Sequence, residues 1–228
     1  MIKNNIPYLL VFSHELKSPL NTILNLAKLI ELSLEEPNKE KIKKYTSIIT
    51  SQVIFMKNYI SNTIELDKIQ SGKQNLVIEE FNIIEILHEV VEITKILIES
   101  KPIQIKTAFE EEELIVSSDL LKIKQILINI ASNSAKFTKE GYILFSLSKL
   151  NNYVLIKVED TGVGIPKEEQ GYIFNPFFSD NFSHEKTYES SKLGLYITKE
   201  LINILGGSIS IESEYGKGTK VYISIPNK

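Results

Sequence analysis

The sequence predicts an α+β fold, with a helical hairpin of about 70 residues followed by an α/β sandwich in which helices cover one face of a mostly antiparallel sheet. Apolar residues recur at three- and four-residue spacing in two long segments before residue 71. After residue 74, segments that alternate between apolar and polar residues are interleaved with helical patterns. The chain of 228 residues is long enough for two domains, which we place at 1–71 and 72–228.

The composition indicates a packed protein and excludes several classes. Hydrophobic residues make up 43% and charged residues 24% of the chain, and the net charge of −3 gives no basic excess for nucleic acid. The chain contains no cysteine, which excludes disulfides and cysteine metal sites and fits a reducing compartment. No apolar run is long enough to span a bilayer, and the N-terminus is a poor signal peptide. We therefore expect a cytoplasmic protein with no membrane segment in this chain.

The first helix is predicted at residues 8–34. Its apolar positions are Leu9, Phe12, Leu16, Leu20, Ile23, Ala27, Ile30 and Leu34. Pro19 interrupts their regular spacing and should kink the helix, because a proline removes one backbone hydrogen bond. His14 lies about one turn before this kink and is followed immediately by an acid, Glu15.

A second helix is predicted at about 39–70, after the turn signal at 35–38. Its heptad seam consists of Ile42, Tyr45, Ile49, Gln52, Met56, Tyr59, Thr63 and Leu66. A single hairpin cannot bury the seams of both helices, so the pattern favours a homodimer that forms a four-helix bundle. The alternative is a two-helix appendage on the next domain.

The remaining pattern predicts a mixed domain after a linker at 71–74. The expected strands are 75–80, 103–109, 142–150, 153–159, 208–212 and 219–225. The expected helices are 83–100, 119–137 and 193–205. Asn151 and Asn152 form the predicted turn of a hairpin, and Gly206 and Gly207 close the last helix.

Two clusters suggest a nucleotide site, although each has a plainer explanation. Asn129 and Asn133 lie four residues apart on one helix face, and carboxamide oxygens suit Mg²⁺; by themselves they could form an ordinary polar face. Asp160 ends a strand and could accept a hydrogen bond from an exocyclic amine such as adenine N6. Gly162 and Gly164 follow it and permit close approach of a ligand, but they could equally form an ordinary turn.

Two further clusters lie near the C-terminus. Residues 173–178 are rich in phenylalanine, and the long polar stretch 179–192 suits a mobile lid. Leu193-Gly194-Leu195 opens a helix, and the N-terminus of a helix attracts phosphate through its free amides and its dipole. The segment 216–219 supplies more glycine and ends at Thr219.

Taken together, these motifs resemble a sensor histidine kinase of two-component systems over almost the whole chain. Residues 14–20 resemble the phosphoacceptor box and 129–138 the N box. Residues 160–164 resemble the first glycine box, 174–178 the F box, and 193–195 the end of the second glycine box. The resemblance implies a dimerisation and phosphoacceptor domain followed by a Bergerat-type ATP-binding sandwich, as in gyrase-type and chaperone ATPases.

The resemblance also implies the role of each residue. His14 would receive the γ-phosphoryl group, Glu15 would act as a base, and Ser18 could orient water for dephosphorylation of the partner. The residues implied in ATP binding are Asn129, Asn133, Lys136, Phe137, Asp160, Gly162, Gly164, Ile165, Lys192, Leu193, Gly194, Leu195 and Thr219. Asn133 and Asn129 would hold Mg²⁺. The phosphoryl group would then pass to an aspartate in the receiver domain of a response regulator, and the chain could be the cytoplasmic part of a longer membrane-bound receptor.

Two departures from the family pattern keep alternatives open. The positions that usually begin the second glycine box are Ser190, Ser191 and Lys192, and Ser179-Asp180 replaces the usual basic residue after the F box. Every basic residue is a lysine, so Lys192 is the best candidate for a phosphate clamp. A degenerate kinase acting as a dimeric scaffold is therefore the second hypothesis. A separate gyrase-like ATPase is a third, but it leaves the hairpin unexplained.

Overall fold

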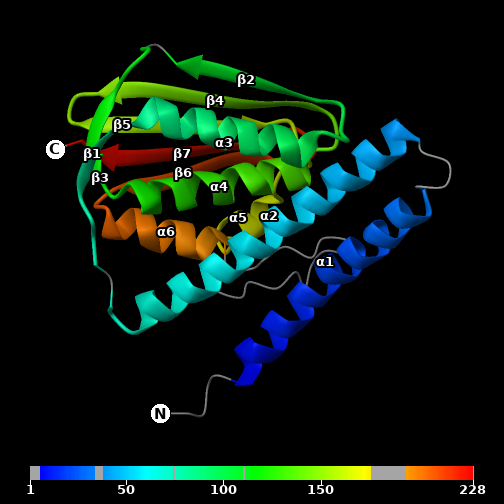
Figure 1. Cartoon of the computed structure of the whole chain (residues 1–228). Helices are drawn as coiled ribbons and strands as arrows, with labels where there is room; N and C mark the ends of the chain where they lie inside the picture. The colour runs from blue at the N-terminus through cyan, green and yellow to red at the C-terminus, as the bar shows by residue number, and fades with distance from the viewer. Residues whose placement is uncertain (1–5, 34–37, 74, 110, 176–193, 228) are drawn as a thin grey trace.

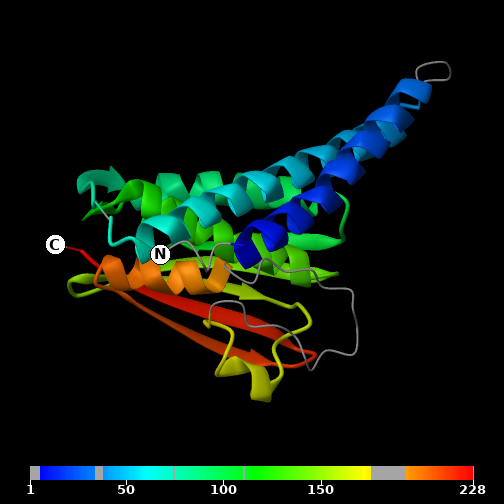
Figure 2. The ribbon, with the colours of Figure 1, turned by 90° about the horizontal axis from the view of Figure 1, so that it is seen from below.

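The computed structural model places a long helical hairpin against the helical layer of an α/β sandwich (Figures 1 and 2). It describes residues 6–33, 38–73, 75–109, 111–175 and 194–227; within 6–15 it describes the backbone only. Three helices of the sandwich, at residues 83–98, 120–137 and 194–204, form one layer, the sheet forms the other, and the hairpin lies along the helical layer (Figure 2).

The described helices include two long ones and several shorter ones. They are α1 (Ile6–Leu32), α2 (Lys39–Gln70), α3 (Ile83–Ile98), α4 (Leu120–Phe137), α5 (Lys167–Gln170) and α6 (Gly194–Ile204). Helix α1 is assigned as one helix through Pro19. Helix α2 begins at an N-cap, Asn38, whose side chain accepts a hydrogen bond from the Lys41 N–H, and it ends before Gly72, where φ is +65°.

The described strands form two sheets. They are β1 (Glu79–Asn82), β2 (Ile103–Phe109), β3 (Ile115–Ser118), β4 (Gly141–Leu150), β5 (Tyr153–Asp160), β6 (Ser208–Glu214) and β7 (Gly218–Pro226). The main sheet has the order β2-β4-β5-β7-β6, in which only β2 and β4 are parallel. Strands β1 and β3 form a small antiparallel pair. These findings confirm the expected mostly antiparallel sheet covered by helices on one face.

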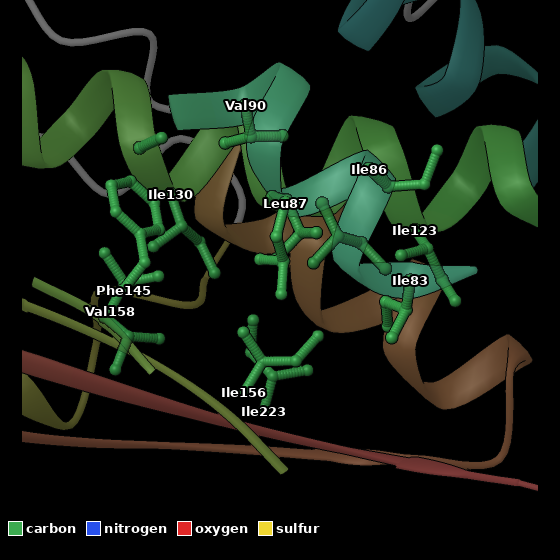
Figure 3. Packing of buried hydrophobic residues seen from close by; sticks show 14 of the residues in the cluster. Ile83, Ile86, Leu87, Val90, Ile123, Ile130, Phe145, Ile156, Val158 and Ile223 are labelled. Atoms are coloured by element: carbon green, nitrogen blue, oxygen red, sulfur yellow. The ribbon is translucent and has the colours of Figure 1, made fainter. Parts of the chain in front are cut away.

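The core lies between the main sheet and helices α3, α4 and α6. Alternate residues of β4 and β5 point inward, and Phe145, Ile156 and Val158 are fully buried (Figure 3). They pack against residues such as Leu87 of α3 and Ile130 of α4. This burial supplies the main stabilisation of the sandwich, at roughly 1.5–3 kcal/mol for each fully buried large aliphatic or aromatic side chain.

Three local expectations need correction. The strand expected at 75–80 begins only at Glu79, where pairing with β3 begins. Strand β3 was not predicted, because four residues are too few to show a clear alternation. Helix α5 was also missed, since its four residues are short and strongly polar. The other expected helices and strands are present, with ends shifted by at most a few residues.

Candidate functional site

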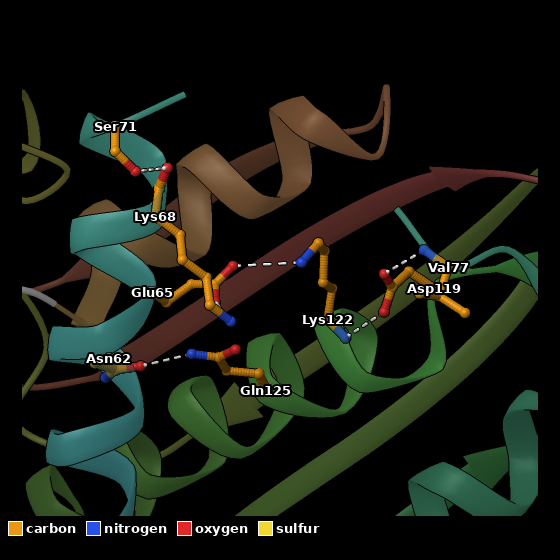
Figure 4. A network of polar contacts seen from close by, with 8 residues as sticks. All are labelled: Asn62, Glu65, Lys68, Ser71, Val77, Asp119, Lys122 and Gln125. Atoms are coloured by element: carbon orange, nitrogen blue, oxygen red, sulfur yellow. Dashed lines mark hydrogen bonds and ion pairs between the residues drawn. The ribbon is translucent and has the colours of Figure 1, made fainter. Parts of the chain in front are cut away.

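Helix α4 is the central element of the site, because it carries four of the predicted nucleotide-binding residues. Asp119 caps its first turn: Oδ1 accepts a hydrogen bond from the Lys122 N–H at 3.0 Å. The other carboxylate oxygen, Oδ2, accepts a hydrogen bond from the Val77 N–H, also at 3.0 Å (Figure 4). Asp119 therefore ties the start of α4 to the segment that leaves the hairpin.

The C-terminal end of α4 is held by Lys101, which lies between α3 and β2. Its Nζ donates hydrogen bonds to the Ala135 carbonyl and, at 2.9 Å, to the Thr138 carbonyl. The last carbonyls of a helix have no partner within the helix, and a positive charge also favours that end of the helix dipole. Burial lowers the pKa of the Lys101 ammonium. This lysine therefore sets the position of the last turn of α4, which carries Lys136 and Phe137.

Asp160 ends β5 beside this last turn. Its carboxylate is buried; Oδ2 accepts a hydrogen bond from the Ser134 hydroxyl and Oδ1 from the Gly162 N–H, both at 2.9 Å. Burial raises the pKa of the Asp160 carboxyl, and the hydrogen bonds from Gly162, Ser134 and the Thr219 N–H oppose that shift. Each carboxylate oxygen can accept more than one hydrogen bond, so Asp160 can also accept one from a ligand amine.

The loop after β5 fits tightly against the protein at both of its predicted glycines. A Cβ on Gly162 would lie 2.7 Å from the Phe137 carbonyl oxygen. A Cβ on Gly164, where φ is +68°, would overlap the Glu214 carbonyl oxygen. Both glycines are therefore required by the protein's own packing, whereas the sequence suggested only that they make room for a ligand.

Ser213 connects Ile165 and Thr219, two more of the predicted residues. Its hydroxyl accepts a hydrogen bond from the Ile165 N–H at 2.8 Å and lies 2.9 Å from Thr219 Oγ1. Thr219 also pairs with Asp160 in the ladder between β5 and β7. Asp160, Ile165 and Thr219 thus gather beside the C-terminal end of α4.

Asn129 joins three helices. Its Nδ2 donates hydrogen bonds to the Gly194 carbonyl and, at 2.7 Å, to Thr198 Oγ1, both in the first turns of α6. Its Oδ1 accepts a hydrogen bond at 3.3 Å from Nδ2 of Asn62 in α2. A Cβ on Gly194 would lie 2.7 Å from Asn129 Oδ1, so the contact requires a glycine there. Asn129 therefore has a positioning role that the sequence did not reveal.

A cleft of about 270 Å³ separates the hairpin from α4. Residues of α1 and α2, Ser18 among them, line one side, and residues of α4 line the other. The lining residues are Ser18, Pro19, Ser51, Gln52, Phe55, Asn58, Tyr59, Asn62, Leu97, Lys101, Asn129, Ser132, Asn133, Ala135 and Lys136. The cleft brings Ser18 together with Asn129, Asn133 and Lys136 of the predicted site.

Lys136 is one of the residues that line this cleft. Its Nζ is 5.6 Å from the ring centroid of Phe137 and 6.0 Å from that of Phe55 in α2. Both distances are within the range of a cation–π contact. Lys136 therefore carries a positive charge between the hairpin and the end of α4, where an anionic phosphate could bind.

The residues lining the cleft fit a magnesium ion that is held mainly by phosphate oxygens. Asn133 lines the cleft and can offer a carboxamide oxygen, while Asn129 Oδ1 keeps a lone pair beyond its bond to Asn62. The described residues contain no cluster of three or more His, Asp or Glu side chains suited to a metal. The described residues therefore suit a magnesium ion that binds together with a nucleotide, and they do not supply a complete set of metal ligands by themselves.

Buried polar contacts join α2 to α4. Lys122 Nζ and Glu65 Oε1 form an ion pair at 3.3 Å, and their side chains are only 11% and 6% exposed (Figure 4). One turn away, Gln125 Nε2 donates a hydrogen bond to Asn62 Oδ1 at 3.2 Å. Leu66, next to Glu65, is part of the main core. The hairpin is thus docked on the helix that carries the candidate site.

The side chains of some predicted site residues are not described. His14 and Glu15 belong to α1, but only their backbone is described. Lys192 and Leu193 lie outside the described residues, as do the lid stretch 179–192 and its departures from the family pattern. Leu195 is half-buried in the first turn of α6, beside Gly194. The site residues that the sequence missed are chiefly Lys101, Asn62 and Ser134, and of these only Ser134 falls within a recognised motif.

Two family models match the chain. Residues 9–72 match the His Kinase A (phospho-acceptor) domain, and residues 118–228 match the histidine kinase-, DNA gyrase B- and HSP90-like ATPase. No helix in the described part of the chain has the length and apolarity needed to cross a membrane.

Several known proteins are similar to this chain over nearly its whole length. The autoinducer 2 sensor kinase/phosphatase LuxQ of Vibrio vulnificus is 31% identical over 98% of this chain, which spans 27% of LuxQ. Full-length ShkA, solved with AMPPNP, is 25% identical with a TM-score of 0.67 over 97% of this chain and 46% of its own. Histidine kinase ThkA, solved with the response regulator protein TrrA, is 26% identical with a TM-score of 0.61 over 98% of this chain and 62% of its own.

The fold, the order of the motifs and these matches agree along the chain. The hairpin carrying His14 corresponds to the phospho-acceptor model, and the sandwich carrying Asp160 to the ATPase model. The chain therefore belongs to the sensor histidine kinases of two-component systems and carries their phospho-acceptor and ATP-binding domains.

Proposed function

We propose that this chain is an ATP-dependent histidine kinase that phosphorylates His14 and passes the phosphoryl group to an aspartate of a response regulator receiver domain. The observation that carries the proposal is the cleft between the hairpin and α4, which is lined by Ser18 on one side and by Asn133 and Lys136 on the other. Four residues of α-helix rise about 6 Å, so the His14 backbone lies one turn from Ser18.

The transfer needs a neutral imidazole and a base beside it. A lone pair of the His14 ring would attack the γ-phosphorus of ATP, while the bond to the β,γ-bridging oxygen breaks and ADP leaves with that oxygen. The phosphorylated ring then carries a proton on its other nitrogen, and Glu15 would accept it. The base stands next to the acceptor in the sequence, which is why we assign this role to it.

The nucleotide would bind around the last turn of α4. The Asp160 carboxylate would accept a hydrogen bond from the adenine amino group, supported by Ile165, Thr219 and the two loop glycines. The ring of Phe137 would lie over the nucleotide, and Lys136 would attract its phosphates. Asn133, assisted by Asn129, would hold Mg²⁺, which neutralises phosphate charge when bound.

The first turns of α6 complete the proposed phosphate site. Gly194 and Leu195 lie at the N-terminal end of α6, where backbone amides and the helix dipole favour an anion. We assign Lys192 and Leu193 to the same end by sequence alone. The asparagine contact to Gly194 supports this assignment, because it fixes the start of α6 against α4.

We further propose that the chain is a homodimer and that the domain boundary falls at residues 71 and 72. Large apolar side chains on the hairpin are exposed in the single chain: Leu20, Leu24, Leu29, Leu32, Val53, Ile60 and Ile64. A second hairpin would bury them in a four-helix bundle. Light scattering should give the dimer mass at micromolar concentration, and a monomer would contradict this part of the proposal.

Incubation with γ-labelled ATP and Mg²⁺ tests the kinase function. We expect label that is lost in acid and retained in base, as phosphohistidine requires, and we expect it to pass to a receiver domain of a cognate response regulator. The His14→Gln variant should remain unlabelled while binding ATP normally, because the histidine lies outside the nucleotide site. Acid-labile label in that variant would move the acceptor to another residue, such as His88 or His184.

A further inference from the structure

We propose that His14 is phosphorylated in cis, by the ATP-binding domain of its own chain. The inference rests on the proposed kinase function and adds which chain supplies each half of the site. In a dimeric bundle, the ATP-binding domain of either chain could stand beside a given histidine, and the sequence does not distinguish the two arrangements.

The first observation is that one chain builds both walls of the transfer cleft. Ser18 and Pro19 of α1 line the same cleft as Asn133 and Lys136 of α4. The phosphate-attracting lysine thus stands across the cleft from the acceptor helix of its own chain.

The second observation concerns the helical position of His14. Residues four apart in an α-helix lie on nearly the same face, about 6 Å apart along the axis. Because Ser18 lines the cleft, the backbone of His14 lies on that same face, one turn away. The acceptor position on α1 is therefore one helical turn from the cleft that its own chain lines.

The third observation is that the ATP-binding domain is held at its own hairpin. The buried Glu65–Lys122 pair, the Asn62–Asn129 hydrogen bond and the burial of Leu66 all join α2 to the sandwich within one chain. Removing one partner of a buried ion pair is strongly unfavourable, because it leaves a desolvated charge uncompensated. These contacts hold each ATP-binding domain beside the cleft that its own α1 helps to line.

The connection between the two domains also favours the cis arrangement. Residues 71–78 separate α2 from β1 and span at most about 28 Å when fully extended. The hydrogen bond from the Val77 N–H to Asp119 shortens the free part of this connection further. The ATP-binding domain is therefore tethered close to the C-terminal half of its own α2.

The step itself balances within one chain. A nitrogen lone pair of His14 forms the N–P bond, the bond between the γ-phosphorus and the bridging oxygen breaks, and ADP leaves with that oxygen and its electron pair. The proton on the second ring nitrogen passes to Glu15. The step involves no change of oxidation state and needs no reactant besides ATP.

Mixed dimers test the proposal. One chain carries His14→Gln and the other, with a different tag, carries both Asn133→Ala and Asp160→Ala, which remove the nucleotide site. The mixed dimer is purified through both tags and incubated with γ-labelled ATP and Mg²⁺. We expect no label on either chain, because neither chain has both an acceptor and a nucleotide site. Label on the Asn133→Ala/Asp160→Ala chain would show transfer in trans and overturn the proposal.

Two controls separate this inference from the proposed function. The wild-type homodimer must be labelled; if it is not, the kinase function itself fails. A mixed dimer of wild type and the nucleotide-site variant should carry half the label of the wild-type homodimer, all of it on the wild-type chain. Label on the nucleotide-site variant chain would instead contradict cis transfer, because only the ATP-binding domain of the wild-type chain could have supplied it, and it would leave the kinase function intact.

Discussion

The buried Glu65–Lys122 pair gives the most specific prediction about how the hairpin is docked. Lys122 is 11% exposed and has Glu65 as its ion-pair partner, whereas Glu65 also contacts the half-exposed Lys68 at 3.4 Å. Glu65→Leu should therefore cost about 3–5 kcal/mol of unfolding free energy, because it leaves a buried ammonium unpaired. Lys122→Met should cost less, roughly 1.5–3 kcal/mol, since Glu65 keeps Lys68.

The double variant is the decisive member of this series. Replacing both partners of a buried pair by apolar residues is often close to neutral, so E65L/K122M should lose much less than the sum of the two single variants. Urea denaturation followed by circular dichroism measures each free energy. The exposed pair of Lys95 and Glu92, at 2.7 Å, is the matched control, and Lys95→Met should cost less than about 1 kcal/mol.

Two outcomes would refute this reasoning. If both single variants cost no more than the Lys95→Met control, the pair does not hold α2 to α4. If the single effects simply add in the double variant, within about 0.5 kcal/mol, the two side chains are not coupled. Either result would also weaken the argument that each ATP-binding domain stays at its own hairpin.

Three further predictions concern the nucleotide site. Asp160→Asn should weaken ATP binding more than GTP binding. Because the pKa of the Asp160 carboxyl is raised, the ATP affinity of the wild type should fall on acidification at a higher pH than for an ordinary aspartate. Calorimetry across pH checks both expectations, and the same pH profile in the variant would contradict the role of this carboxyl. Gly194→Ala should lower both the thermal midpoint and ATP affinity, because the new Cβ would lie 2.7 Å from Asn129 Oδ1; an unchanged midpoint would argue against that contact. Lys101→Met should lower the free energy of unfolding by about 1.5–3 kcal/mol and raise the KM for ATP, and Lys101→Arg should partly restore both. A loss of stability without a change in KM would mean that Lys101 only stabilises the end of α4 and does not position the nucleotide site.

Periodicity was sufficient to predict the main framework from sequence. The two long helices, the helix that becomes α4 and the β4–β5 hairpin each show a sustained pattern of apolar residues, and a sustained pattern follows directly from burial of one face. The turn at Asn151 was predicted from residue type, and φ there is +52°, a conformation that asparagine tolerates well. Among the motif residues, Asp160, Gly162 and Thr219 lie beside the C-terminal end of α4, whereas residues 176–193 lie outside the described part of the chain.

The contacts between the domains could not be predicted in this way. Asn62 and Glu65 lie beside the apolar seam of α2 and would normally face water, yet both are buried against α4. Lys101 sits in a short loop with no pattern around it, and its role depends on the distant end of a helix. A hydrophobic pattern shows which face is apolar, but it does not reveal which polar residues find partners across an interface.

Site mapping by mass spectrometry would test the central claim most directly. The intact chain is incubated with ATP and Mg²⁺ at neutral pH, and its mass and the position of any added phosphate are determined without exposure to acid. We predict one phosphoryl group per chain, attached to the His14 ring and absent from His14→Gln. Phosphate on any other residue, or an unmodified chain that still binds ATP, would contradict the account.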